Sequence, residues 1–249
     1  MSSVDKALEI VTRLSKPPYK MRLTEIAGFL GMSKSAAYQI LKSLENYQFV
    51  VRDPMTKVYN LGPVLLRLGY VYDQIKGLRH LCLPVMKEVV NQTGLTCYVS
   101  VREGIQSFLA YKVDSPDFNS IFYRDIMGSL QSFNCGATGK LLAAHLPAED
   151  IAKLLEKGLE KRTSRSITDK DELLSEYEKI RKRGYATAVR ELNENTWGIG
   201  VPILGAYKEA VAALGIMGPI DTYSEDQVNR FFLILKDHAK IISEQLRFK

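Results

Sequence analysis

Five polar side chains between residues 34 and 42 have the types and spacing of a surface that contacts nucleic acid. They are Lys34, Ser35, Tyr38, Gln39 and Lys42. Residues three or four apart lie on one face of a helix, so these side chains would share a face. Glutamine can bond adenine N6 and N7 as a bidentate pair, worth roughly 1–3 kcal/mol of discrimination, and lysines suit phosphates. An ordinary solvated helix face has the same pattern, so these residues alone leave both interpretations open.

Metal and catalytic chemistry have no comparable pattern. The cysteines Cys82, Cys97 and Cys135 are far apart, and the histidines beside them give no metal-ligand spacing. The chain has no nucleophile elbow and no clustered histidine–aspartate pair. The segment GATGK, residues 136–140, lacks the spacing of a phosphate-binding loop and the Ser or Thr that follows its lysine. We therefore expect no metal, no cofactor and no enzymatic activity.

The positive charge is concentrated at the start of the chain. The whole chain of 249 residues has a net charge of +6. Residues 1–76 contain 11 Lys/Arg and 6 Asp/Glu, a net of +5, whereas the remaining 173 residues contain 23 and 22. This distribution favours a polyanion binding to the first third. The sparse, odd cysteine count and the absence of a signal peptide or a long apolar run predict a cytoplasmic protein without a membrane partner.

Three helices are predicted to position the polar face. The first, residues 4–14, has apolar residues at spacings of three and four and Ser3 as its N-cap. The second begins at Thr24 and ends at Gly31, which supplies the left-handed backbone of a tight turn. The third, residues 34–46, is capped by Ser33. A helix, a glycine turn and a capped helix form a helix-turn-helix, in which the last helix enters the major groove.

A wing and a linker are predicted after these helices. Residues 49–51 and 58–61 read as two short strands around a turn, and Arg52 and Lys57 would lie along the phosphate backbone. Gly62-Pro63 then breaks the chain before an apolar-periodic helix over residues 64–75. The wing makes the nucleic-acid interpretation of the polar face the stronger one.

Six segments in this order resemble the IclR family of bacterial transcriptional regulators. They are SVDKALEIV, LTEIAGFLGMSKSAAYQILKSLENYQFVVRDPMTKVYNLG, TGLTCYVSV, GATGKLLAAHLP, SITDKDELLSEYEKIRKRGYA and VAALGIMGP. The resemblance covers essentially the whole chain. It implies an α+β protein with a winged helix-turn-helix (residues 1–62), a linker helix used in dimerisation (63–77) and a GAF-like effector-binding domain with a mixed sheet (78–249). It also implies binding of double-stranded operator DNA as a homodimer or a dimer of dimers.

The chain departs from the family pattern at three places. Gln39 stands where many relatives have arginine, so the operator sequence does not follow from the resemblance. The wing turn DPMTKVY has no glycine, which leaves its conformation open. Residues 132–134 replace a Pro-Leu-His segment, so no histidine-dependent contact is expected.

The last two thirds of the chain are predicted to alternate between helices and strands. We expect a helix at 78–92, strands at 95–101 and 105–113, and an irregular loop at 114–138 that folds over a pocket. Helices follow near Gly139 and after Pro147, and a charged helix capped by Thr168 ends at Gly184. Strands at 185–191, 198–204 and 211–218 complete the sheet. A final helix is capped by Ser224 with Gln227.

The resemblance places the effector against residues 136–139, the loop after Tyr185 and the strand that holds Gly215 and Met217. Where relatives that bind small carboxylates have acidic or hydroxyl side chains, this chain has Ala188, Gly215 and Met217. This exchange removes polar partners and adds room and apolar surface, which favours an aromatic or largely apolar effector. The predicted effector-binding residues are Tyr123, Gln131, Phe133, Cys135, Ala137, Thr138, Ala188, Glu191, Thr196, Gly198, Gly215 and Met217.

Several residues have a structural interpretation beside the functional one. Tyr98 and Tyr111 suit the core of a sheet as well as a pocket, and Cys135 suits small apolar filler better than a redox sensor. Glu191 can contact a ligand or pair with a buried arginine. The basic run at residues 179–183 complements a helix dipole rather than forming a second nucleic-acid surface.

The sequence thus predicts a ligand-responsive DNA-binding transcriptional regulator, with its partners being operator DNA, a small-molecule effector and a second copy of itself. Two competing classes remain, an enzyme with a fused DNA-binding domain and an architectural DNA-binding protein without a ligand. Repression and activation are both compatible with the sequence.

Overall fold

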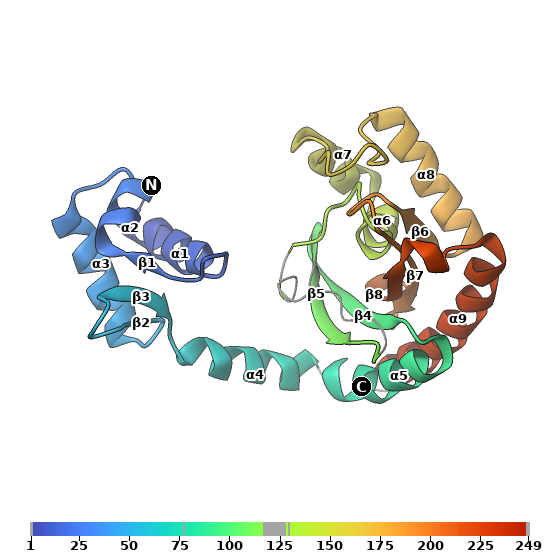
Figure 1. The fold of residues 1–249 in the computed structure, drawn as a ribbon, viewed down its shortest axis with the longest axis horizontal. Coiled ribbons are helices and arrows are strands. Elements are labelled where there is room, and N and C mark those ends of the chain that lie inside the picture. Colours follow the sequence, from blue (N-terminus) through green and yellow to red (C-terminus); the bar gives the residue numbers. More distant parts are fainter. Residues whose placement is uncertain (1, 77, 117–127, 129, 248–249) are drawn as a thin grey trace. The chain divides into compact units, whose positions relative to one another are not determined.

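The computed structural model describes residues 2–76, 78–116, 128 and 130–247 (Figure 1). The chain divides into two compact units, Met1–Gly77 and Leu78–Lys249. Each unit has its own buried apolar cluster, and each is described by itself below.

The first unit is a winged helix-turn-helix followed by one further helix. Its elements in order are α1 (Ser3–Leu14), β1 (Met21–Arg22), α2 (Leu23–Phe29), α3 (Lys34–Asn46), β2 (Val50–Arg52), β3 (Val58–Leu61) and α4 (Val64–Lys76). The strands form an antiparallel sheet in the order β1-β3-β2. The sequence did not predict β1, because a strand of two residues has no periodicity to detect.

Side chains at the helix starts differ in part from the prediction. Ser33 caps α3 as expected, since its Oγ accepts a hydrogen bond from the N–H of Ala36 at 3.2 Å. The cap of α1 is Ser2 and not Ser3, because Ser2 Oγ accepts from the N–H of Asp5 at 3.1 Å. Thr24 does not open α2, which begins at Leu23. The Glu25 carboxylate instead accepts a hydrogen bond from the N–H of Arg22 at 2.6 Å.

The second unit is built on a five-stranded sheet in the order β5-β4-β8-β7-β6. The strands are β4 (Thr96–Glu103), β5 (Gln106–Val113), β6 (Ala186–Val189), β7 (Thr196–Leu204) and β8 (Ala210–Pro219). The predicted α+β class is confirmed. The sheet was expected to be mixed, and each of its four described strand pairings is antiparallel.

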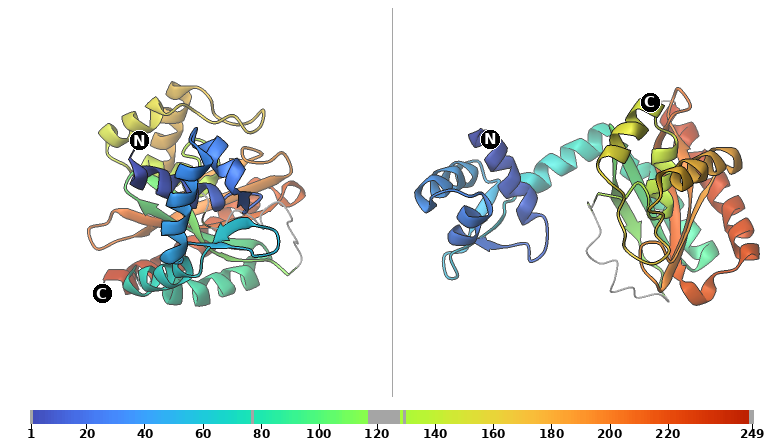
Figure 2. Two further views of the ribbon diagram at one scale, coloured as in Figure 1. Left: turned by 90° about the vertical axis from the view of Figure 1, so that its left-hand side faces the viewer. Right: turned by 90° about the horizontal axis from the view of Figure 1, so that it is seen from above.

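Helices cover both faces of this sheet (Figures 1 and 2). Helices α5 (Leu78–Thr93) and α9 (Glu225–Arg247) share one apolar cluster with the sheet, and α6 (Ala137–Ala144), α7 (Ala148–Glu156) and α8 (Lys170–Arg183) share another. A short 3-10 helix, η2 (Ile220–Thr222), precedes α9. Because both faces are covered, residues 96–101 of β4 are buried without alternation.

The helix ends of this unit agree in part with the prediction, as α8, α9 and α6 show. Asp169 caps α8 by accepting from the N–H of Glu172 at 2.9 Å, so the prediction of Thr168 as the cap is wrong. Gly184 ends α8 with a φ of +80°, as predicted. Ser224 accepts from the N–H of Gln227 at 3.2 Å before α9. Helix α6 begins at Ala137, two residues before the predicted start.

Candidate functional site

The predicted DNA-contacting residues all lie at the surface of the first unit. Thr24, Ser33, Lys34, Ser35, Tyr38, Gln39, Lys42, Arg52 and Lys57 are exposed. On α3, Ala37 and Leu41 are buried on the opposite side, 0 % exposed. The helix is therefore anchored by a small apolar stripe and presents its polar residues to solvent.

The wing turn forms without a glycine. The Asp53 carboxylate accepts hydrogen bonds from the N–H groups of Met55 at 2.8 Å and Thr56 at 2.7 Å. These backbone donors hold the pKa of Asp53 below its ordinary value. Lys57 takes the left-handed conformation, φ +59°, that a glycine would adopt more easily. The wing turn therefore forms without a glycine, because Asp53 binds the backbone N–H groups within it and Lys57 adopts the left-handed conformation.

Four cations of this surface are free to meet an external anion. Lys34, Lys42, Arg52 and Lys57 form no ion pair with a carboxylate of the described residues. The Arg52 guanidinium lies 5.7 Å from the centre of the Tyr59 ring, which holds it at the base of the wing. The helix and the wing therefore carry unpaired positive charge on both sides of Gln39.

The first unit also exposes apolar surface. On α4, Leu66 is 81 % exposed and Tyr70 is 63 % exposed. Between α1 and α3 lies an open apolar groove of about 410 Å³, with Val4, Leu8 and Tyr47 exposed along it. Such surface on one small unit is a mark of an interaction site.

In the second unit, six of the predicted effector-binding residues line one small cavity. They are Ala137, Ala188, Glu191, Thr196, Gly198 and Met217. The cavity also meets Tyr98, Gly136, Leu192 and Trp197. Its volume is about 20 Å³, which holds about one water molecule. The site is therefore assembled but closed.

Tyr98 fills the space that two glycines leave. A Cβ at Gly215 would lie 2.8 Å from Tyr98 Cζ, and one at Gly198 would lie 3.5 Å from its hydroxyl oxygen. Tyr98 is 5 % exposed and packs with Leu109 and Met217. Gly215 was expected to add room for the effector, whereas the Tyr98 ring occupies that room.

A buried ion pair forms one wall of the cavity. Lys140 Nζ lies 2.5 Å from Glu191 Oε1, and the N–H of Gly136 donates to the other carboxylate oxygen at 3.1 Å. Burial raises the pKa of Glu191 above its ordinary value, although Lys140 opposes this shift. The partner of Glu191 is thus a lysine and not an arginine. The sequence does not indicate this partner, because Lys140 and Glu191 are 51 residues apart and meet only in the fold.

Two other predicted residues face the protein interior. Thr138 Oγ1 is hydrogen-bonded to Ser100 Oγ at 2.9 Å, and Thr138 is 1 % exposed. Cys135 is 1 % exposed, and burial raises the pKa of its thiol. A buried thiol with a raised pKa favours the role of small filler over that of a redox sensor.

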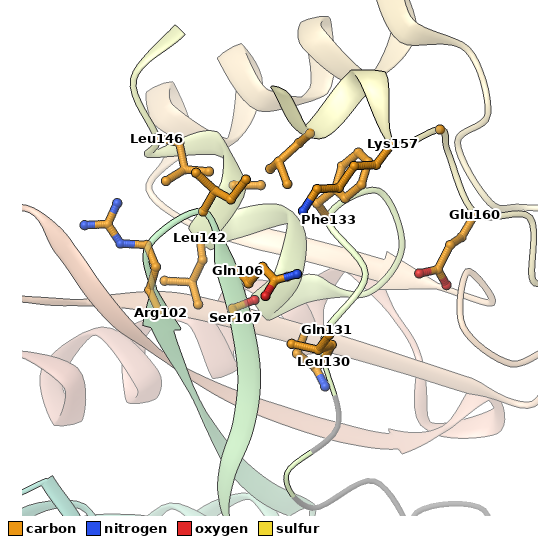
Figure 3. Close-up of a pocket in the computed structure, with 15 residues that line it drawn as sticks. Arg102, Gln106, Ser107, Leu130, Gln131, Phe133, Leu142, Leu146, Lys157 and Glu160 are labelled. Carbon is orange, nitrogen blue, oxygen red and sulfur yellow. The ribbon is translucent and has the colours of Figure 1, made fainter. Parts of the chain in front are cut away.

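Gln131 and Phe133 line a different cavity, of about 200 Å³, shown in Figure 3. The N–H of Gln131 donates to the carbonyl of Ser107 at 2.7 Å, so this segment runs beside β5. Tyr123 lies outside the described residues. Of the 114–138 loop, the described part therefore does not bring Gln131 and Phe133 to the cavity beside Glu191.

Other single residues have structural roles. Trp197 is 2 % exposed, and its Nε1 donates to Thr222 Oγ1 at 2.9 Å. Tyr111 packs against the apolar cluster of α5 and α9. Arg181 and Arg183, from the basic run, donate to the carbonyls of Ala144 and Tyr185 at 2.7 Å, which supports the structural interpretation of that run.

Asn134, in the segment that departs from the family pattern, binds the backbone of the loop between α7 and α8 through its side chain. It is 0 % exposed, and its amide donates to the carbonyls of Glu160 at 2.8 Å and Ile167 at 2.7 Å. Its Oδ1 accepts from the N–H of Glu160 at 3.1 Å. Asn134 thereby fixes the loop between α7 and α8.

Over the described part of the chain, no group of three or more His, Cys, Asp or Glu side chains is arranged to hold a metal ion. No helix within the described ranges is both long and apolar enough to cross a membrane.

Comparison with known proteins places both units. The family described as "Bacterial transcriptional regulator IclR C-terminal" matches residues 72–244, and the "IclR helix-turn-helix domain" matches residues 3–54. The chain is 28% identical over 250 residues to the glycerol operon regulatory protein of Streptomyces coelicolor, covering 99% of this chain and 96% of that protein.

Solved structures are similar over the whole length. An IclR transcriptional regulator from Alicyclobacillus acidocaldarius has a TM-score of 0.84 at 26% identity, covering 97% of both chains. An IclR homologue from Microbacterium hydrocarbonoxydans, solved in complex with 4-hydroxybenzoate, has a TM-score of 0.84 at 20% identity, covering 100% of both chains.

Proposed function

The chain belongs to the IclR family of bacterial transcriptional regulators, and on this premise we propose that it regulates transcription from an operator in response to a largely apolar small molecule. Residues 1–62 contact DNA, residues 63–77 link and dimerise, and residues 78–249 bind the effector. The observation that carries the DNA half is the exposed face of α3 beside a wing with unpaired cations.

Base recognition rests on Gln39, and phosphate contact rests on Lys34, Lys42, Arg52 and Lys57. Gln39 is exposed at the middle of the polar face of α3, where a recognition helix contacts base edges. The four cations lie on α3 and the wing and form no ion pair with a carboxylate of the described residues. Affinity falls as salt concentration rises, and each phosphate contact makes the plot of log affinity against log salt concentration steeper by about 0.9.

The DNA proposal is tested by selecting bound duplexes from a random pool and comparing two variants on the selected site. Gln39→Ala should relax base preference at one position and leave the salt slope unchanged. Lys57→Gln should weaken binding to all duplexes alike and make the plot of log affinity against log salt concentration shallower by about 1. If both variants bind every duplex like the parent, the groove assignment is wrong.

The effector site is the cavity between Ala188, Glu191 and Met217. Its lining is mostly apolar, with Trp197, Tyr98 and Met217 as the large surfaces and Thr196 and Glu191 as the polar groups. This lining suits an aromatic or largely apolar acid, whose polar end meets Thr196 or the N–H of Gly136. The homologue of similar fold that was solved in complex with 4-hydroxybenzoate supports an aromatic acid as the effector class.

Effector entry requires the cavity to open. Leu192 packs so closely on Gly136 that a Cβ at Gly136 would lie 2.7 Å from Leu192 Cδ1. The loop that carries Leu192 is joined to α6 through the bond from Gly136 to Glu191. An effector that replaces this contact moves the loop relative to α6. It can shift the protein between arrangements only by its differential affinity for them.

Calorimetry against 4-hydroxybenzoate, benzoate and glyoxylate tests the effector class. The aromatic acids should bind more tightly than glyoxylate. An Ala188→Asp variant, which adds a carboxylate to the lining, should weaken the aromatic acids. Tight binding of glyoxylate alone would overturn the proposed class without affecting the DNA assignment.

Dimerisation through α4 is supported by its exposed apolar side chains, Leu66 and Tyr70 above all. Sedimentation of a Leu66→Glu variant should show a larger monomer fraction than the parent, and operator affinity should fall with it. Arg67→Glu, a change of charge on the same helix at the neighbouring position, serves as the matched control. An unchanged sedimentation profile for Leu66→Glu would contradict this role of α4.

A further inference from the structure

The cavity of about 200 Å³ in the second unit is separate from the proposed effector site. Different residues of α6 line the two: Ala137 meets the effector cavity, whereas Gly139, Leu142 and Ala143 meet the larger one. Ala137 and Gly139 lie roughly 200° apart around a helix of 3.6 residues per turn. The two cavities therefore lie against different sides of α6.

The walls of the larger cavity are mainly apolar. Its apolar lining comes from the β4–β5 turn, the segment before α6, α6 itself and α7, through Ile105, Phe133, Leu142, Leu146 and Leu154. Leu142 is 1 % exposed and Leu154 is 3 % exposed, so these side chains belong to the apolar cluster of α6, α7 and α8. A ligand here would place an apolar body against a rigid surface.

One polar group of this cavity is buried without a partner. Ser107 is 7 % exposed, and its hydroxyl forms no hydrogen bond with any described residue. Buried hydroxyl groups in proteins are nearly always hydrogen-bonded. Gln106, Ser107 and Lys157 all line the cavity, and in Figure 3 the amino end of Lys157 is turned into it. The lining thus includes a hydroxyl, an amide and an ammonium group.

The charge around this cavity is positive and uncompensated. Lys157 and Arg102 form no ion pair with a described carboxylate. The lining carboxylate, Glu160, is paired with the Arg162 guanidinium at 2.7 Å. In Figure 3 the guanidinium of Arg102 points away from the cavity, so Lys157 is the cation that faces inward.

We propose that this cavity is a second ligand site, which binds a small carboxylate with an apolar body. The carboxylate accepts hydrogen bonds from Lys157 Nζ, Ser107 Oγ and the Gln106 amide, and the apolar body lies against Phe133, Leu142 and Leu154. Charge-assisted bonds to a carboxylate are about twice as strong as neutral ones, so Lys157 provides most of the selectivity. This site goes beyond the proposed function, because neither DNA binding nor the effector cavity requires it.

The test uses benzoate, the full-length protein and two variants of equal charge change. Calorimetry should show that Lys157→Gln weakens one class of benzoate site by about tenfold or more. Arg102→Gln, which removes a cation that points outward, should change that affinity by less than about threefold. Benzamide, which has the same shape without the charge, should bind this site at least about tenfold more weakly than benzoate.

Trp197 separates this site from the effector cavity. It is the one tryptophan of the chain and lines the effector cavity only. Benzoate binding that is abolished by Lys157→Gln but leaves Trp197 fluorescence unchanged supports the second site. If all benzoate binding alters Trp197 fluorescence and survives Lys157→Gln, the second site is refuted and the effector cavity stands. Equal losses in Lys157→Gln and Arg102→Gln would also overturn the proposal, since they indicate only a general effect of charge.

Discussion

The Lys140–Glu191 pair should tolerate the loss of its acid far better than the loss of its base. Lys140 has a side chain 1 % exposed and lies 2.5 Å from Glu191 and 3.9 Å from Glu176. Removing Glu191 leaves Lys140 near a second carboxylate. Removing Lys140 leaves the Glu191 carboxylate, 11 % exposed, with the N–H of Gly136 as its one remaining donor among the described residues. Removing Lys140 therefore leaves a buried carboxylate without a cation, whereas removing Glu191 leaves a lysine that still has Glu176 nearby.

The expected magnitudes follow from that difference. Breaking a buried pair so that one charge is stranded costs roughly 3–5 kcal/mol. Because Gly136 still donates to Glu191, we place Lys140→Met near the lower end, about 3 kcal/mol. Glu191→Gln keeps an acceptor for Gly136 and should cost about 1 kcal/mol. The double variant should recover part of the loss of Lys140→Met, since no buried carboxylate remains at position 191.

The loss in Lys140→Met should depend on pH. Burial already raises the pKa of Glu191, and removal of the lysine takes away the charge that opposes this shift. An acid whose folded pKa is raised destabilises the fold above that pKa. The loss is therefore full above the folded pKa and shrinks as the pH falls through the folded pKa toward the unfolded value of about 4.3.

Urea unfolding at pH 7 and pH 5, followed by the fluorescence of Trp197, measures this effect in the second unit. Trp197 is the single tryptophan, so the signal reports on that unit of a two-unit chain. A loss below about 1 kcal/mol for Lys140→Met, or a loss that is equal at both pH values, would show that Glu191 is not a stranded buried carboxylate.

Three further predictions concern the wing and the sheet. Lys57→Gly relieves a left-handed backbone of φ +59°, so the stability of the first unit, measured by thermal unfolding, should stay within about 1 kcal/mol of the parent while DNA affinity falls; an equal fall in both would contradict a phosphate contact. Gly215→Ser places a Cβ 2.8 Å from Tyr98 Cζ and should lower the free energy of unfolding by about 1–3 kcal/mol. Ala188→Ser, at the cavity lining, should lower it less, and urea unfolding at pH 7 compares the two variants. A Gly215→Ser variant as stable as the parent would show that the Tyr98 ring is not confined. Because backbone donors lower the pKa of Asp53, the wing turn should be stabilised above the ordinary carboxyl value and lose this support as the pH falls through the lowered pKa; NMR titration of the Met55 amide should have its midpoint below about 3.9, and a midpoint at or above it would refute the turn.

The first unit was the more predictable one because its signals are local. The cap of α3 depends on residues three apart, and Ser33 was placed correctly on that basis. The cap of α1 was displaced by one position, because the adjacent Ser2 and Ser3 give the same composition signal. Helix α2 begins one residue before Thr24, without a side-chain cap at its preceding residue. The wing turn resisted prediction at Lys57, since a left-handed lysine has no sequence mark.

In the second unit, the errors come from contacts between distant residues. Gln131 was assigned to the effector cavity from its place in a loop, yet a bond to Ser107 turns it toward the larger one. Gly215 was taken as added room, yet Tyr98 on the neighbouring strand β4 fills it. No periodicity or motif reports which side chain enters the gap left by a glycine one strand away.

The closed effector cavity gives these long-range contacts a functional meaning. About 20 Å³ between Ala188 and Met217 does not hold a molecule the size of benzoate, so an effector must displace Tyr98 or Leu192. The observed affinity is then the intrinsic affinity reduced by the fraction of molecules that are open. Displacement of Leu192 would remove its packing on Gly136 at the start of α6, so this route of opening the cavity also loosens the loop that carries Leu192 from α6. If the proposed effector binds here, the side chains that fill the cavity set both how tightly it binds and what its binding changes.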